Sequence, residues 1–218
     1  MEEQIKNCRI ILGDNMEYMK NIPDKYYGLC VVDPPYGLGI DGQKKGTSKN
    51  PKHNRKEHSK KNWDSSIPSK EYFEELFRIS KNQIIWGANY FVEHLTEGHK
   101  GWIVWDKGQH GLTMSDCELA YSSFDVPTRV FVKNRVALLQ DGTIHPTQKP
   151  IKLYEWIYIN YAEKGMKILD THLGSGSSAI AAYKVGMDLE FTGIEIDEEY
   201  YNNAVKRIKW ETSQGSLF

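Results

Sequence analysis

GMKILDTHLGSGSSAIAAYKVGMDLEFTGIEID, residues 165–197, contains in order an apolar strand, a glycine-rich turn, a helix, a second apolar strand and an acid. Gly174 and Gly176 let the backbone approach a ligand closely, and the serine pair 177–178 is expected to cap the helix. Glu195 follows about 20 residues after the turn, where dinucleotide-binding folds place a carboxylate that binds ribose. The whole unit predicts a nucleotide-binding crossover, although its glycines alone would also fit an ordinary tight turn.

The charge around the turn indicates which nucleotide suits it. Asp170 ends the first strand, and the turn has neither a third glycine nor the lysine of a P-loop. A carboxylate at this place favours a ligand that carries positive charge. S-adenosylmethionine meets this requirement, because it has an ammonium, a sulfonium and a ribose diol. NAD is also compatible with the expected geometry.

Apolar runs and helical patterns alternate along the rest of the chain. Several runs are apolar on consecutive residues, which is typical of strands buried on both faces. The alternation predicts an α/β fold with a mostly parallel sheet that helices cover on both sides. Seven strands are expected, at 9–12, 29–32, 83–86, 102–105, 118–123, 167–169 and 191–196. Helices are expected at 69–81, 150–164, 177–185 and 197–211.

Composition limits the class of protein. The length of 218 residues fits a single domain, 1–218, and the formal net charge of -1 gives no global basic field. Cys8, Cys30 and Cys117 lack CxxC spacing, which predicts reduced, packed thiols and no metal site. The N-terminus has no apolar leader, and no apolar run approaches the roughly 20 residues that span a bilayer. A cytoplasmic protein without membrane attachment is therefore expected.

A second informative segment is VVDPPYG at Val31–Gly37, where an apolar strand ends in an acid, two prolines and an aromatic. Proline cannot continue a sheet, and the residue before a proline is pushed towards extended geometry. The carboxylate of Asp33 and the carbonyl of Pro34 are thus held in fixed directions where the strand stops. Taken alone, the segment would also fit a strand followed by a solvated turn.

A basic segment follows directly, within an expected flexible loop at 37–66. Asp41–Asn62 contains eight Lys or Arg against two acids and no large apolar residue, so it cannot pack in a core. Its position after DPPYG favours contact with nucleic-acid phosphates over a merely solvated insertion. The candidate contacts are Lys44, Lys45, Lys49, Lys52, Arg55, Lys56, Lys60 and Lys61.

Three motifs in this order, DPPY at 33–36, HPTQKP at 145–150 and DTHLGSGS at 170–177, resemble the β class of amino-group DNA methyltransferases. The resemblance covers most of the chain and implies a Rossmann-like S-adenosylmethionine-dependent methyltransferase fold with a seven-stranded sheet. In that class the catalytic motif precedes the cofactor motif, a circular permutation that this sequence shares. The chain is similar to small phage or mobile-element forms. Its size leaves little room for a separate target-recognition domain, so sequence specificity would come from the basic loop and from parts of 106–144.

The resemblance implies a mechanism for the DPPY segment. Asp33 and the carbonyl of Pro34 would each accept one N–H of the target amino group, which turns the nitrogen lone pair towards the methyl donor. Tyr36 would stack on the target base, which must be flipped out of the duplex. Pro35 would add rigidity.

The resemblance also implies the cofactor contacts. The HPTQKP segment would close over the methionine part, with Lys149 facing its carboxylate. His172 stands where the family usually has an aromatic; it either replaces that packing contact or is satisfied by backbone. Asp14 either lies near the adenine or caps a helix. The expected contacts are Asp14, His145, Thr147, Lys149, Asp170, His172, Gly174, Ser175, Gly176 and Glu195.

The chain ends in SQGSLF, and this end, 213–218, resembles the short peptide that docks bacterial repair proteins on the sliding clamp. Gln214, Leu217 and Phe218 would be the contacts; a frayed or folded-back terminus is the alternative. A homodimer is left open.

The leading expectation is site-specific adenine-N6 methylation of double-stranded DNA, of the kind found in restriction–modification, because Asp before PPY is commoner in the adenine enzymes. A cytosine-N4 enzyme of the same fold is the nearest alternative. A catalytically silent DNA-binding or clamp-associated module is the second.

Overall fold

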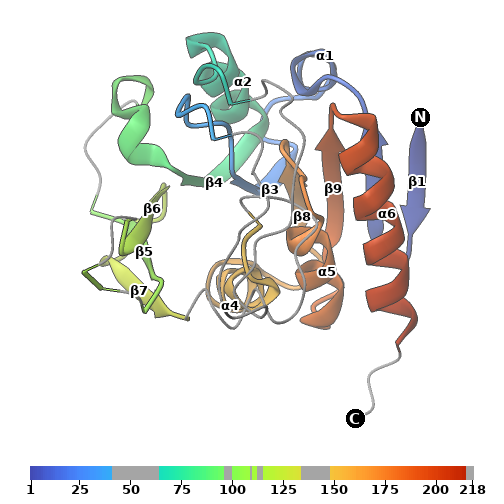
Figure 1. Ribbon diagram of the computed structural model, residues 1–218. Helices are drawn as coiled ribbons and strands as arrows, with labels where there is room; N and C mark the ends of the chain where they lie inside the picture. The colour runs from blue at the N-terminus through green and yellow to red at the C-terminus, as the bar shows by residue number, and fades with distance from the viewer. Residues whose placement is uncertain (41–63, 96–99, 109, 112–114, 134–147, 215–218) are drawn as a thin grey trace, which may run out of the picture.

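The computed structural model describes residues 1–40, 64–95, 100–108, 110–111, 115–133 and 148–214. Within this part a single sheet of nine strands runs through the molecule in the order β1-β2-β9-β8-β3-β4-β6-β5-β7 (Figure 1). Five neighbouring pairs are parallel and three are antiparallel. The α/β fold with a mostly parallel sheet is confirmed.

All seven predicted strands are present, but the expectation of a seven-stranded sheet was wrong. The two further strands, β1 and β7, are four-residue strands at the two edges of the sheet. Only Ile5 is buried in β1 and no residue is fully buried in β7, so neither shows the apolar run that marks a central strand. The strands are β1 (Glu2–Ile5), β2 (Cys8–Leu12), β3 (Tyr27–Val32), β4 (Ser80–Trp86), β5 (Trp102–Asp106), β6 (Cys117–Ser122), β7 (Arg129–Val132), β8 (Lys167–Asp170) and β9 (Glu190–Glu195).

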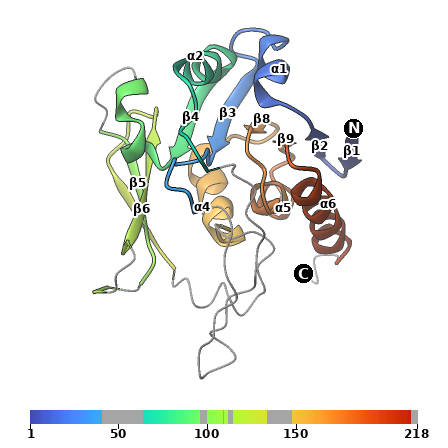
Figure 2. The ribbon, with the colours of Figure 1, turned by 45° about the horizontal axis from the view of Figure 1, so that its top comes forward.

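Helices cover both faces of the sheet, as predicted. Figure 2 shows α1 and α2 on one side and α4, α5 and α6 on the other. The four predicted helices are confirmed, and α1 joins them. The helices are α1 (Asn15–Lys20), α2 (Lys70–Ile79), α4 (Ile151–Tyr161), α5 (Ser177–Lys184) and α6 (Glu198–Ser213), with single 3-10 turns η2 (Ala88–Tyr90) and η3 (Val92–His94).

Each face of the sheet has its own hydrophobic core. Along β3, Leu29 and Val31 pack in the core under α4 to α6, whereas Cys30 and Val32 pack in the core under α1 and α2. The strand is therefore apolar on consecutive residues because both of its faces are buried. Cys8 and Cys30 are buried free thiols, and burial raises the pKa of each to about 12, which keeps them protonated.

The order of the parallel strands creates one crevice. Strands β2, β9, β8, β3 and β4 are mutually parallel neighbours, so their carboxyl ends share an edge. From the adjacent pair β8 and β3 the chain proceeds in opposite directions, to β9 on one side and to β4 on the other. Ligands of open α/β sheets bind at such a switch point. Asp170 ends β8 there, and Asp33 follows β3.

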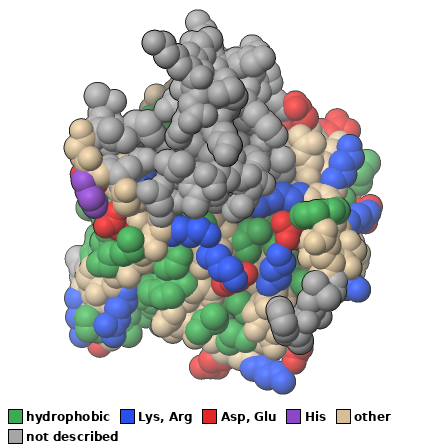
Figure 3. Space-filling view, turned by 60° about the horizontal axis from the view of Figure 1, so that its bottom comes forward, with side chains coloured by type: hydrophobic (Ala, Val, Ile, Leu, Met, Phe, Trp, Pro, Cys, Tyr) green, Lys and Arg blue, Asp and Glu red, His purple; other side chains and the backbone are tan. Residues whose placement is uncertain are grey.

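Two surface findings bear on possible partners. No helix among the described residues has the length and apolar character needed to cross a membrane. On the face that Figure 3 shows, Lys and Arg side chains stand among acidic and hydrophobic ones rather than forming one basic field. All eight basic residues predicted to contact DNA lie outside the described residues.

Candidate active site

Two pockets open at the carboxyl edge of the sheet. The first, here the glycine-turn pocket, has a volume of about 340 Å³ and is lined mainly by the β8–α5 turn, the end of β9 and the start of α6. The second, here the Tyr36 pocket, has a volume of about 550 Å³ and is lined by the DPPY segment, η2 and the β5–β6 strands. Asp33, Pro35, Gln148 and Lys149 line both pockets, so they stand at the border between them.

The glycine turn is fixed by Glu195. Its carboxylate accepts hydrogen bonds from the backbone N–H of Gly174 (2.8 Å) and of Asp197 (3.0 Å). This ties the turn after β8 to the start of α6, and both lie against the glycine-turn pocket. Burial raises the pKa of Glu195 above its ordinary value.

The expected serine cap of α5 was wrong. Gly176 is the N-cap, with φ of 74°, and no side chain caps the helix. The hydroxyl of Ser178 instead donates to the buried carboxylate of Asp170 (2.5 Å), which also accepts from the backbone N–H of His172 (3.0 Å). Both donors are neutral, and burial raises the pKa of Asp170 to about 7.

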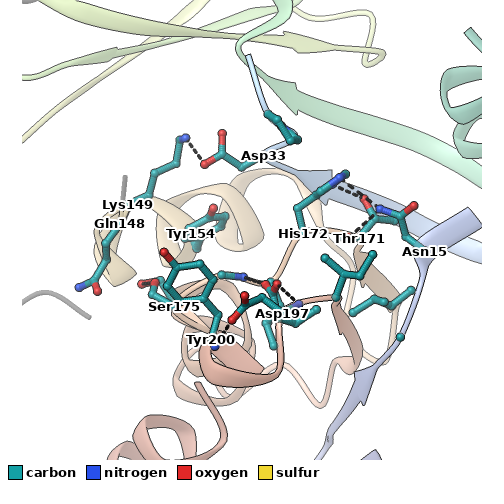
Figure 4. Close-up of a pocket in the computed structure, with 18 residues that line it drawn as sticks. Asn15, Asp33, Gln148, Lys149, Tyr154, Thr171, His172, Ser175, Asp197 and Tyr200 are labelled. Carbon is teal, nitrogen blue, oxygen red and sulfur yellow. Dashed lines mark hydrogen bonds and ion pairs between the residues drawn. The ribbon is translucent and has the colours of Figure 1, made fainter. Parts of the chain in front are cut away.

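His172 is held by side chains on the wall of the glycine-turn pocket (Figure 4). Its Nε2 accepts from the Asn15 amide (3.1 Å), which leaves the Nδ1–H to donate to the Thr171 hydroxyl (3.0 Å). Tyr72 bonds the same hydroxyl (2.7 Å) and meets the imidazole edge-on. Burial lowers the pKa of His172 to about 4, so the ring is neutral at physiological pH and presents an uncharged surface to the pocket.

Asp33 stands at the border of the two pockets with two donors already in place. Tyr36 Oη donates to Asp33 Oδ1 (2.6 Å), and the Lys149 ammonium pairs with Oδ2 (Figure 4). Lys149 also donates to Tyr36 Oη (3.2 Å), which closes a triangle of three side chains. Burial raises the pKa of Asp33, and the Lys149 ammonium opposes that effect. Since an ionised carboxylate has about four acceptor directions, Asp33 can still accept N–H groups from a ligand.

The segment after the prolines is anchored by a residue from the far end of the predicted loop. Asp64 is buried, and its carboxylate accepts from the backbone N–H groups of Tyr36 (2.8 Å), Gly37 (2.9 Å) and Ile40 (3.0 Å). The Tyr36 ring is stacked on Tyr90 with centroids 5.0 Å apart and planes inclined by 17°. An aromatic surface thus lines the Tyr36 pocket.

Of the predicted site residues that the structure describes, most line the two pockets. Asp33 and Pro35 line both pockets, and Pro34 and Tyr36 line the second. Those lining the glycine-turn pocket are Lys149, His172, Gly174, Ser175 and Glu195. His145, Thr147, Leu217 and Phe218 lie outside the described residues.

Three predicted cofactor contacts have other positions. Asp170 and Gly176 support the glycine turn without lining its pocket. Asp14 is the N-cap of α1 and accepts from the backbone N–H groups of Met16 and Glu17, while its neighbours Gly13 and Asn15 line the pocket. The capping alternative for Asp14 is therefore confirmed.

Several lining residues were missed. Most of them follow the carboxyl ends of parallel strands or lie on the helices just beyond, where the switch-point rule would have placed them, whereas Gln148 and Tyr154 lie just before and on α4. These residues are Gly13, Asn15, Gln148, Tyr154, Thr171, Asp197 and Tyr200. Lys149 was expected beside a ligand carboxylate, whereas its ammonium is directed to Asp33, Glu118 and Tyr36.

The N6_N4_Mtase family model, described as DNA methylase, matches residues 122–206. A Type II methyltransferase of Streptococcus pneumoniae, M2.DpnII, is 40% identical over 67 residues, which is 31% of this chain and 24% of that protein. Over these segments the chain is similar to amino-group DNA methyltransferases. The match thus spans only about a quarter of this relative's length. A Haemophilus influenzae Type II methyltransferase, M.HinfI, is 23% identical over 262 residues, covering 96% of this chain and 71% of the relative.

Solved structures of methyltransferases share the fold. The M1.HpyAVI–SAM complex superposes with a TM-score of 0.62 at 20% identity, over 92% of this chain and 98% of that one. The PvuII DNA methyltransferase, described as cytosine-N4-specific, has a TM-score of 0.62 at 13% identity, over 98% of this chain and 89% of that one.

Gly87 determines where Tyr36 can lie. Gly87 has φ of 70°, and a Cβ there would overlap the Tyr36 ring, whereas Gly186 has φ of 65° and open space around its Cβ position. We expect Gly186→Ala to lose about 1–2 kcal/mol of unfolding free energy from backbone strain alone. Gly87→Ala should lose about 1–3 kcal/mol more, because Tyr36 must move. Urea unfolding of both variants measures the difference; equal losses would contradict a close Gly87–Tyr36 packing.

Proposed function

We propose that the protein is a DNA adenine-N6 methyltransferase that uses S-adenosylmethionine. The observation that carries the proposal is the shared border of the two pockets. The glycine-turn pocket would hold the cofactor, the Tyr36 pocket would hold the flipped-out base, and Asp33 stands between them. Pockets of a few hundred Å³ are of the size that small ligands occupy.

The chemistry of the glycine-turn pocket fits a cationic nucleoside. Asp33, Asp170 and Glu195 all have pKa values raised by burial, so a positive charge nearby would stabilise their ionised forms. Glu195 accepts from backbone N–H groups, and its carboxylate has acceptor capacity left for a ribose hydroxyl. When bound, S-adenosylmethionine supplies an electrophilic methyl group on a sulfonium.

The DPPY segment would prepare the acceptor nitrogen. Asp33 and the Pro34 carbonyl accept the two amino N–H groups, which draws the nitrogen lone pair out of the ring and towards the glycine-turn pocket. Tyr36 supplies the stacking surface for the base. The carbon–sulfur bond breaks as the nitrogen–carbon bond forms, and the proton then leaves the alkylated nitrogen through Asp33 to water. Positioning and electrostatic stabilisation carry most of the effect.

Double-stranded DNA is the proposed partner. The basic segment and parts of 106–144 would contact its phosphates and read its sequence, within a single domain. Docking of the tail 213–218 on a sliding clamp stays a separate prediction, and a homodimer is left open. Cytosine-N4 methylation is the second candidate, because the PvuII enzyme, described as cytosine-N4-specific, shares the fold over nearly the whole chain.

The reaction is tested with labelled S-adenosylmethionine and unmethylated duplex DNA, digested to nucleosides for mass identification. We expect N6-methyladenine from the native protein. Asp33→Asn keeps the shape of the side chain but loses the carboxylate acceptor, so its rate should fall by about 10²-fold or more. Asp188→Asn, at an exposed acid remote from the pockets, should be unaffected. N4-methylcytosine would support the second candidate, and no product with bound cofactor would overturn both.

The raised pKa values predict a proton release when the cofactor binds. A cation in the pocket lowers the pKa of Asp170 from about 7, so at pH 7 the complex should release a fraction of a proton. S-adenosylhomocysteine lacks the sulfonium charge, so its binding should release a smaller fraction of a proton. Calorimetric titrations in phosphate and in Tris measure the protons released, and Asp170→Asn should reduce them. Equal release for both ligands would contradict the electrostatic argument.

A further inference from the structure

Four buried or half-buried side chains of alternating charge run from the border of the two pockets along the wall of the Tyr36 pocket. The Lys149 ammonium pairs with Asp33 and with Glu118 Oε2 (3.1 Å), and Lys107 pairs with Glu118 Oε1 (2.8 Å). The side chains of Lys149 and Lys107 are only 2% and 7% exposed. We name these four residues, in the order Asp33, Lys149, Glu118 and Lys107, the charge chain.

The distal half of the charge chain comes from the β5–β6 hairpin. β6 pairs with β4 so that Ala120 is opposite Trp86, which puts Glu118 beyond the end of β4 and beside the Tyr36 pocket. Lys107 follows β5, and its backbone N–H donates to Asp116 O (3.0 Å), just before β6. Glu118 and Lys107 are therefore placed by the sheet itself.

The geometry leaves Lys149 little freedom. Its three N–H groups are matched by Asp33, Glu118 and Tyr36, and the Trp86 ring lies 5.3 Å from its ammonium. A buried ammonium needs such complete pairing, because burial removes the water that would otherwise solvate its charge. Removing one partner would therefore change how the ammonium interacts with the other two.

We propose that Glu118, held by Lys107, is a positioning residue that shares the Lys149 ammonium with Asp33 and so sets how strongly the Asp33 carboxylate is stabilised. This inference rests on the proposed function, since it assigns Asp33 the acceptor role. Glu118 competes with Asp33 for the same ammonium, and Lys107 weakens that competition. Burial favours the neutral form of Glu118, but the two ammonium groups outweigh it and lower its pKa to about 2, so Glu118 is a permanent anion.

Because the charges alternate along the charge chain, the variants should shift the Asp33 pKa in opposite directions. In Glu118→Gln, Lys149 is left to Asp33 alone, so the Asp33 pKa should fall and the acid limb of kcat should move to lower pH. In Lys107→Met, Glu118 draws Lys149 more strongly, so the acid limb should move to higher pH. In Lys149→Met the Asp33 carboxylate loses its counter-ion, and the upward shift should be largest, about 1 unit or more. A merely structural contribution would not alternate in sign.

Other titratable groups also face Asp33, and their titration has to be distinguished from that of Asp33. They are Tyr36 from its own segment, Tyr72 from α2, Tyr154 from α4 and Asp170 from β8. Burial raises the pKa of all three tyrosines, so they stay neutral over the range of interest. Asp170 titrates near pH 7 and could obscure the acid limb, so each variant is also measured with Asp170→Asn.

The experiment records kcat for methyl transfer to duplex DNA from pH 4.5 to 9 for the native protein and the three variants. Glu74→Gln is the matched control, because Glu74 forms an exposed ion pair with Lys70. It should leave the profile unchanged. The proposal is overturned if Glu118→Gln shifts the limb upward or not at all, or if Lys107→Met and Glu118→Gln shift it in the same direction.

A second measurement does not depend on turnover. Carbon-13 NMR titration of the aspartate carboxyls, with Asp33→Asn to assign the Asp33 signal, reports its pKa directly in each folded variant. If the native protein makes no methylated product, the proposed function fails. The direction in which each variant changes the Asp33 pKa, measured by NMR, still tests the proposal for Glu118 and Lys107. Should Glu118→Gln not fold, Lys107→Met and Lys149→Met retain the test, since both must shift the Asp33 pKa upward.

Discussion

The contact between Asp33 and Lys149 joins two parts of the chain that are remote in sequence, and the candidate site depends on it. Asp33 follows β3, and Lys149 directly precedes Pro150, the N-cap of α4. A buried ion pair repays its desolvation only when further hydrogen bonds satisfy both partners. Tyr36 and Glu118 supply those bonds. The pair is thus part of a network whose geometry places an acceptor carboxylate between two pockets.

The topology of the sheet explains why such a network can form. Because β3 and β8 are neighbours and the chain leaves them in opposite directions, the crevice at their ends is open for ligands. The antiparallel β6 then brings Glu118 to the same edge from the other side. One edge of the sheet therefore collects a nucleotide-type turn, a proline-stiffened acceptor and a charged support, although they lie far apart in the sequence.

The parts that the sequence predicted are those with a local signal. Asp33 follows β3, Gly174 lies in the turn after β8 and Glu195 ends β9, and these positions could be recognised from the pattern alone. Glu118 gave no such signal, since one acid in a strand reads as an ordinary solvent-facing residue. Strands β1 and β7 were not predicted, because an edge strand buries too few residues to show an apolar run. The partners of Lys149 come from separate strands, and only the register of the sheet determines them.

Asp33 and Asp170 show how one crevice can give two acids different properties. Both are buried, and burial raises the pKa of both. Asp170 has only neutral donors, Ser178 and a backbone N–H, so its ionised form depends on positive charge that a ligand would bring. Asp33 has a built-in cation in Lys149, so its carboxylate can be stabilised before any ligand arrives. Asp170 and Asp33 therefore differ in how their ionised forms are stabilised, although both are buried. The difference comes from their hydrogen-bond donors, which are neutral for Asp170 and include an ammonium for Asp33. The Lys149 ammonium is itself shared with Glu118, which also pairs with Lys107. On the proposed function, these two residues would set the strength of the Asp33 acceptor without taking part in the reaction.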